Sequence, residues 1–137
     1  MITWQLLPFS SLTTLQLHQL IQLRIDVFVV EQNCPYPELD GKDPLSGVYH
    51  LMGIKDGELI ACARLLTAGT SYDNVSIGRL ATKQSMRGNG LGHELLTQAL
   101  QGCEKLWPNQ TIDIGAQAHL ADFYQGYGFE TISAVYL

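Results

Sequence analysis

The sequence has few charged residues and very few basic ones. Of its 137 residues 15% are charged, and lysine plus arginine number 8 against 13 aspartates and glutamates, for a formal net charge of −5. No run of five basic residues occurs, so bulk attraction to nucleic acid is not expected. Hydrophobic residues make up 46%, which favours a packed core over a disordered chain. The length suits a single domain over residues 1–137.

Long hydrophobic runs and a cysteine framework are also lacking. No apolar run approaches the ~18 residues that would span a membrane, and the first residues lack the order of a signal peptide. Cys34, Cys62 and Cys103 are widely spaced, as is typical of reduced thiols in a cytosolic protein. Neither they nor the four histidines have metal-ligand spacing. We therefore expect a cytoplasmic protein without a metal, a membrane anchor or a nucleic-acid partner.

Hydrophobic periodicity predicts a mixed α/β fold in which an antiparallel part joins a β-α-β part. Thr13 and Gln16 have capping-box spacing at a helix start, and Asp56-Gly57 indicates a type I′ hairpin. Gly78, inside a strand, indicates a bulge or the close approach of another backbone. The expected strands are 2–7, 48–54, 59–66, 75–81, 111–115 and 129–136, and the expected helices start at 13, 91 and 117, the first limited by Pro35.

A glycine-rich turn, Arg87–Gly92, lies between an expected strand and an expected helix. Such a turn offers unpaired backbone N–H groups and the positive end of a helix dipole, which suit phosphate. The turn is not a P-loop, because the required lysine and spacing are missing. It is not the dinucleotide fingerprint either, because His93 stands where the third glycine would be.

The turn resembles the pyrophosphate loop of the Gcn5-related N-acetyltransferase (GNAT) superfamily. A second block, Ala121–Phe129, resembles that superfamily's other signature and stands in the expected order. Further segments resemble its ElaA-like branch: 23–36, 40–41, 63–66, 77–79 and 115–120. The resemblance implies the acyl-CoA N-acyltransferase fold, a mostly antiparallel sheet with a β-bulge and a V-shaped splay, flanked by helices. It also implies an N-acetyltransferase in which an amine attacks acetyl-CoA directly in a ternary complex.

The resemblance also assigns roles to residues. Tyr124 is the implied general acid, since a neutral phenol can protonate the departing thiolate. Gln117 stands where many relatives have asparagine, and the bulge near Gly78 would leave an N–H for the thioester oxygen. The implied acetyl-CoA-binding residues are Leu80, Ala81, Thr82, Arg87, Gly88, Asn89, Gly90, Leu91, Gly92, Gln117, Phe123, Tyr124 and Tyr127.

The acceptor side is indicated by fewer signals. Glu31 closes the first helix against the dipole preference and is a candidate base. Arg24 interrupts an apolar stripe, so it needs a carboxylate partner. We expect it to join Arg64 and the loop carboxylates in a buried ionic group bordering the acceptor pocket. Other candidate bases are Glu38, Asp40, Asp43, His50 and His119, and the candidate acceptor-binding residues are Arg24, Phe28, Asp40, His50, Arg64 and His119.

Several alternatives stay open. The first half of the chain also resembles acyl-homoserine-lactone synthases, in Arg24, Phe28, the loop carboxylates and Ala63–Leu66. A non-catalytic acyl-CoA-binding module is the third reading. The acceptor is a small amine, a peptide N-terminus or a lysine, and a homodimer is left open. Relatives commonly continue past the position of Leu137, so we expect the final strand of the fold to be lacking.

Overall fold

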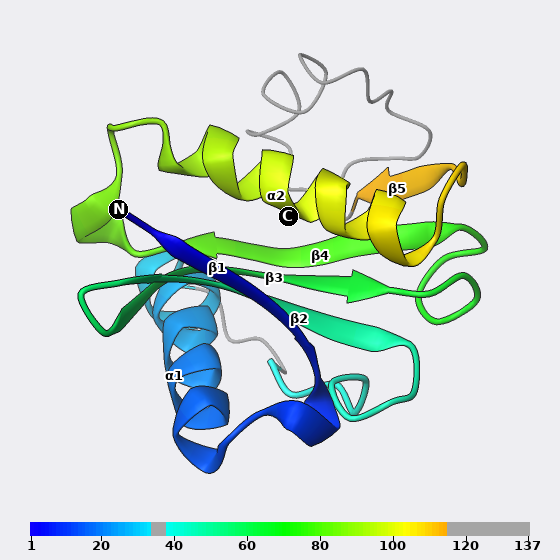
Figure 1. Cartoon of the computed structure of the whole chain (residues 1–137). Coiled ribbons are helices and arrows are strands. Elements are labelled where there is room, and N and C mark those ends of the chain that lie inside the picture. The colour runs from blue at the N-terminus through cyan, green and yellow to red at the C-terminus, as the bar shows by residue number, and fades with distance from the viewer. Residues whose placement is uncertain (34–37, 115–137) are drawn as a thin grey trace.

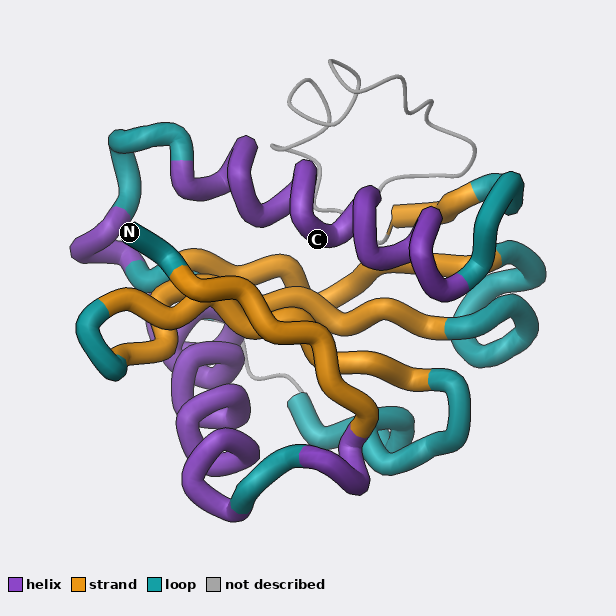
Figure 2. Tube along the Cα trace, in the orientation of Figure 1, coloured by secondary structure: helices purple, strands orange, loops and turns teal. Residues whose placement is uncertain are grey.

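The described residues form a five-stranded sheet with a helix on each face (Figure 1). The computed structural model describes residues 1–33 and 38–114. The strands are β1 (Thr3–Pro8), β2 (Val48–Lys55), β3 (Glu58–Leu66), β4 (Val75–Thr82) and β5 (Ile112–Ile114); the helices are α1 (Thr14–Ile25) and α2 (Leu91–Leu106). The five strands lie side by side in the order β1-β2-β3-β4-β5 (Figure 2). Neighbouring strands are antiparallel, except that β4 and β5 are parallel. The mixed α/β, mostly antiparallel prediction is confirmed.

Two local predictions are confirmed in geometry. Gln16 N donates to Thr13 Oγ1 at 3.0 Å and Thr13 N donates to Gln16 Oε1 at 2.9 Å, which completes the capping box of α1. In the β2–β3 hairpin Asp56 and Gly57 have φ of +52° and +78°, as a type I′ turn requires. The helix and strand expected beyond residue 115, and Pro35, lie outside the described residues.

The end of the first helix differs from the prediction. α1 continues directly into a π-helical segment, Asp26–Glu31, whereas the apolar periodicity predicts only α-helix. Val27 in that segment is buried and Phe28 is half-buried. A π-turn carries an extra residue in its ring, and single π-turns of this kind occur often at functional sites.

The two faces of the sheet differ in what they bury. On one face, Leu91, Leu95, Ala99 and Cys103 of α2 are at most 5% exposed, as their spacing predicts, and pack on the apolar side chains of β3 and β4. The other face packs Leu20, Leu23 and Val27 against Met52, Cys62 and Ala81. That apolar contact covers only part of the second face, and the remainder carries charged side chains.

The predicted bulge in β4 is confirmed, directly after Gly78. Gly78 pairs with Arg64 and Ala81 pairs with Cys62, so two residues of β4 lie opposite one residue of β3. The left-handed backbone conformation falls on Arg79, with φ of +50°, and not on Gly78. Gly78 itself stays in register, because the extra residue enters the strand after it.

Candidate functional site

The glycine turn opens α2 with two left-handed glycines and no capping side chain. Gly88 and Gly90 have φ of +99° and +78°, and a Cβ at either position would meet nothing within 4 Å. Gly90 is the N-cap of α2 and no side chain caps that helix. Within residues 1–33 and 38–114, no hydrogen bond occupies the backbone N–H groups of Gly88, Asn89 and Gly90. These N–H groups, with the helix dipole behind them, therefore suit a phosphate or diphosphate.

Arg87, at the start of the turn, is held by neighbours. Its Nη1 and Nη2 donate to the two Glu31 carboxylate oxygens at 2.7 and 2.9 Å. Its Nε donates to Thr82 Oγ1 at 3.0 Å, and Nη2 also donates to Thr82 O at 2.7 Å. These four bonds engage most of the five N–H donors of the guanidinium. Arg87 thus ties the end of the π-helical segment to the end of β4 and to the glycine turn.

Within the described part of the chain, β5 covers only the first half of the outer side of β4. β5 pairs with Val75, Ser76 and Ile77 and reaches no further along β4. Among the described residues, no strand lies beside 78–82 on the β5 side, which is where the expected splay begins. Leu80, Ala81 and Thr82, the residues expected to run along the pantetheine arm, lie in this stretch. A strand edge of this kind can hydrogen-bond an extended ligand carrying amide groups.

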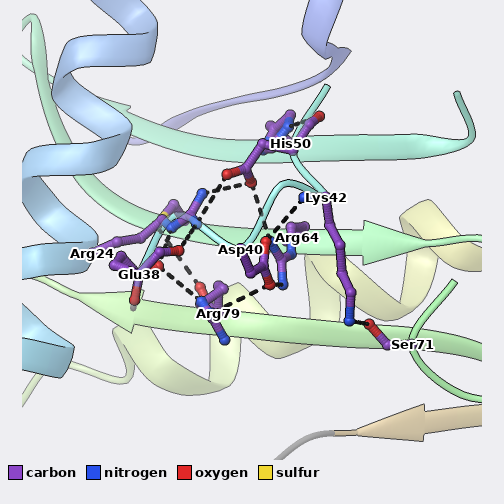
Figure 3. Close-up of polar contacts among 10 residues, drawn as sticks. Arg24, Glu38, Asp40, Lys42, His50, Arg64, Ser71 and Arg79 are labelled. Carbon is purple, nitrogen blue, oxygen red and sulfur yellow. Dashed lines mark hydrogen bonds and ion pairs between the residues drawn. The ribbon is translucent and has the colours of Figure 1, made fainter. Parts of the chain in front are cut away.

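A buried ionic group lies on the α1 face of the sheet (Figure 3), as the sequence predicts. Arg24 Nε contacts Glu38 Oε2 at 2.6 Å and its Nη1 contacts Asp43 Oδ1 at 2.8 Å. Arg64 contacts Asp40 Oδ2 at 2.8 Å and Asp43 Oδ1 at 3.3 Å. The group, which we call the ionic cluster, consists of Arg24, Glu38, Asp40, Asp43, Arg64 and Arg79. Three cations face three carboxylates, so its formal charge balances.

The members of the ionic cluster come from four elements. Arg24 is on α1, Arg64 on β3 and Arg79 on β4, while the carboxylates lie in the loop that leads to β2. The side chains of Arg24 and Arg64 are 2% and 4% exposed, and that of Asp40 is 23% exposed. The cluster therefore fastens the loop at 38–43 to the sheet and to the helix.

Burial and pairing shift the pKa values within the cluster. Burial opposes ionisation of Asp43, but hydrogen bonding and charge from Arg24, with charge from Arg64, hold its pKa below the ordinary value. Burial likewise opposes ionisation of Asp40, yet Arg64 and the Lys42 N–H lower its pKa. The pKa of Arg24 is raised, because Asp43 and Glu38 outweigh its desolvation. All three groups are therefore ionised near neutral pH.

His50 is buried beside the ionic cluster. Its side chain lies 3.2 Å from Asp43 O through Nε2, and the residue is 1% exposed. Burial lowers the pKa of His50, and the charges of Arg24 and Arg64 add to that effect. A neutral imidazole donating to a carbonyl fits these surroundings.

Two buried atoms of the ionic cluster have no hydrogen-bond partner among the described residues: Glu38 Oε1 and Arg64 Nε.

Of the remaining predicted site residues, some lie in the described part of the structure and others do not. Phe28 packs against the apolar core beneath α1, and Glu31 is engaged by Arg87. Sequence reasoning missed Arg79 as a cluster member, although its place directly after the strand glycine marks the bulge. The predictions that lie outside the described residues are Gln117, His119, Phe123, Tyr124 and Tyr127.

Other chemistry is limited within the described ranges. Cys62 and Cys103 are unbridged and buried, and burial raises the pKa of each thiol to about 12, so neither is a thiolate. No set of three His, Cys, Asp or Glu side chains in 1–33 and 38–114 could hold a metal ion. No described helix has the length and apolarity to cross a membrane.

Comparison with known proteins gives consistent matches. The acetyltransferase (GNAT) domain family matches residues 36–136. Protein ElaA of Escherichia coli (strain K12) is 44% identical over 136 residues, which cover 99% of this chain and 89% of ElaA. The crystal structure of E. coli ElaA superposes with a TM-score of 0.94 over 100% of this chain and 93% of that one. An acyl-CoA N-acyltransferase structure from Pseudomonas aeruginosa, also 44% identical, gives 0.94 over 100% and 94%.

Proposed function

The chain belongs to the acetyltransferase (GNAT) domain family and is an acyltransferase, and from that premise we propose that it transfers the acetyl group of acetyl-CoA to a primary amine. The full-length similarity to an acyl-CoA N-acyltransferase supports nitrogen as the accepting atom. The amine forms the new C–N bond, the C–S bond of the thioester breaks, and the amine proton leaves to a base. We take residues 1–137 as one catalytic domain and, from the unbridged thiols of Cys62 and Cys103, propose a cytoplasmic setting.

The observation that carries the proposal is the glycine turn. Among the described residues, the N–H groups of Gly88, Asn89 and Gly90 at the N-terminus of α2 have no hydrogen-bond partner, and a Cβ at Gly88 or Gly90 would meet nothing within 4 Å. A diphosphate accepts several such hydrogen bonds and gains from the helix dipole. Leu80, Ala81 and Thr82 then receive the pantetheine arm along β4. When bound, acetyl-CoA supplies an activated thioester, and the protein supplies its placement.

The remaining catalytic roles follow the family pattern. We propose that Tyr124 donates a proton to the departing thiolate and that Gln117, Phe123 and Tyr127 contact acetyl-CoA. On the acceptor side, we propose that the pocket lies against the loop at 38–43, near Arg24, Phe28, His50, Arg64 and His119. Asp40 is the most exposed carboxylate of the ionic cluster, so it is the member best placed to meet an ammonium group. The acceptor is a small amine, a peptide N-terminus or a lysine.

Turnover is tested by mixing purified protein with acetyl-CoA and amines of the three acceptor classes. We expect release of free thiol that depends on one class of amine. Binding of acetyl-CoA without turnover against any amine would favour a non-catalytic binding module, and absence of binding would contradict the proposal. A parallel reaction with an acyl-carrier-protein thioester and S-adenosylmethionine tests the lactone-synthase alternative, which is favoured by the observed pairing of Arg24 and Arg64 with the loop.

A matched pair of glycine variants isolates the turn. Gly90 and Gly57 both have φ of +78°, and a Cβ at either would meet nothing within 4 Å. Alanine at either position therefore carries the same backbone cost of about 1–2 kcal/mol. We expect Gly90→Ala to weaken acetyl-CoA binding in a calorimetric titration and Gly57→Ala to leave it unchanged. Equal effects of the two substitutions would remove the turn from the site.

A further inference from the structure

Arg79 occupies a backbone conformation that its side chain does not favour. Four non-glycine residues of the described chain have positive φ, and three of them, Asn33, Asp56 and Asn109, are Asn or Asp in turns. These residue types tolerate the left-handed region. Arg79, at φ of +50°, lies inside β4 at the first position of a bulge, and in bulges whose first residue is left-handed that residue is typically glycine. A conformation of this kind persists where surrounding contacts hold it.

The bulge changes which side of the sheet each residue of β4 faces. Ile77 belongs to the apolar core under α2, so strict alternation would point residue 79 into the same core. Instead Leu80 packs on that core and Ala81 packs on the α1 face. The extra residue therefore puts Arg79 on the α1 face and sets the side-chain phase of the rest of the strand.

Contacts with Glu38, Asp40 and Cys62 help to hold Arg79 in this position. Its Nε donates to Glu38 Oε2 at 2.8 Å, and the same oxygen accepts from Arg24 Nε at 2.6 Å (Figure 3). Asp40 Oδ2 adds a longer contact with Arg79 Nη2 at 3.5 Å. On the backbone side, the Cys62 thiol donates to Arg79 O at 3.9 Å. Glu38, which is 5% exposed, thus joins the bulge directly to α1.

We propose that Glu38 is a positioning residue for the transferase, because its ion pair with Arg79 fixes the bulge and hence the register of Leu80, Ala81 and Thr82. The inference rests on the proposed function, in which those residues receive the acyl-CoA arm. Without the pair, the alternation of β4 favours a regular strand or a mixture of registers, and the thioester is held less well. A misplacement of about 1 Å at a reacting centre can cost up to roughly a hundredfold in rate.

The test compares Glu38→Gln with Glu58→Gln. Both remove one carboxylate charge from a pair with a cation on or next to β4, but Glu58 pairs with Lys83 at the surface, outside the cluster. Hydrogen exchange of the segment 78–82 is read together with kcat and the KM for acetyl-CoA. We expect Glu38→Gln to speed exchange there and to lower kcat/KM about tenfold, and Glu58→Gln to change neither. Equal behaviour of the two variants would overturn the inference.

If Glu38→Gln does not fold, two variants of Arg79 at the bulge test the same inference. Arg79→Ala removes the ion pair but keeps the free-energy cost of a left-handed backbone conformation in a residue with a Cβ. Arg79→Gly removes both the ion pair and that cost. We expect Arg79→Ala to lower kcat/KM and to speed exchange more than Arg79→Gly does. Wild-type kinetics and exchange in both would overturn the inference. A wild-type protein that does not use acetyl-CoA would contradict the proposed function, while exchange at 78–82 would still decide the role of Glu38 at the bulge.

Discussion

The ionic cluster and the Arg87–Glu31 pair use the same chemistry in opposite surroundings. Arg24 and Glu38 are 2% and 4% exposed in their side chains, whereas Arg87 and Glu31 are 36% and 28% exposed. Removing one partner of a buried pair leaves an uncompensated charge, while an exposed pair contributes little. The comparison teaches that the loop at 38–43 is a fixed part of the framework. Arg87, at the glycine turn, is held by exposed contacts that are expected to contribute much less stability.

The largest expected effect is the loss of stability when the buried ion pairs of Arg24 are removed. Arg24→Met leaves Glu38 and Asp43 without their shared cation, and we expect a loss of about 3–5 kcal/mol in the free energy of unfolding. Arg87→Met makes the same substitution at the exposed pair, and we expect at most about 1 kcal/mol. Urea unfolding of both variants gives the two values. Unchanged stability and turnover in Arg24→Met would contradict a framework role for the cluster.

An intermediate effect is expected from pH. The pKa of His50 is lowered by burial and by the nearby Arg24 and Arg64, so below about pH 6.5 the unfolded chain binds more protons at this site than the folded one. The free energy of unfolding should therefore fall as pH drops from 6.5, by at most about 1.4 kcal/mol per unit. Below about pH 3.9 the lowered pKa of Asp43 adds a further loss of the same sign.

Unfolding measured in urea between pH 7 and 3 checks the pH prediction. His50→Gln keeps a donor for Asp43 O and removes the titrating group, so the slope between pH 6.5 and 5 should flatten. A slope that survives in His50→Gln would assign the pH dependence to another group.

The smallest expected effect concerns the exposed pair. Arg87 must leave Glu31 before it can offer both outer nitrogens to a phosphate, and that pair is worth at most about 1 kcal/mol. We therefore expect Glu31→Gln to bind acetyl-CoA up to about fivefold more tightly in calorimetry. Weaker binding would show instead that Glu31 aims Arg87 at the ligand. Normal binding with a large loss of kcat would support Glu31 as the base.

The sequence predicted the features that depend only on residues close together in the chain, such as the helix cap and the hairpin turn. Thr13 and Gln16 satisfy each other within one turn, and Asp56-Gly57 selects its hairpin by backbone preference alone. Arg24 also predicted its carboxylate partners, because an arginine on an apolar helix face cannot be buried unpaired. The ionic cluster was therefore foreseeable as a group, though not its exact pairs.

Features set by the assembled sheet were not predictable in this way. Glu31 and Arg87 are 56 positions apart, and only the packing of the π-helical segment beside the end of β4 brings them together. The left-handed conformation of Arg79 depends on a register between β3 and β4 that no short stretch encodes. Gly78 predicted the bulge, but the left-handed backbone conformation is adopted by the next residue, Arg79.

The central claim is that the turn at the start of α2 holds the diphosphate of acetyl-CoA. The most direct measurement is a titration of isotope-labelled protein with acetyl-CoA, followed through the backbone amide resonances. The account predicts that the amides of Gly88, Asn89 and Gly90 shift most and saturate together, while Gly57 in the β2–β3 hairpin does not respond. Saturable shifts that leave the turn unchanged, or no shifts at all, would contradict it.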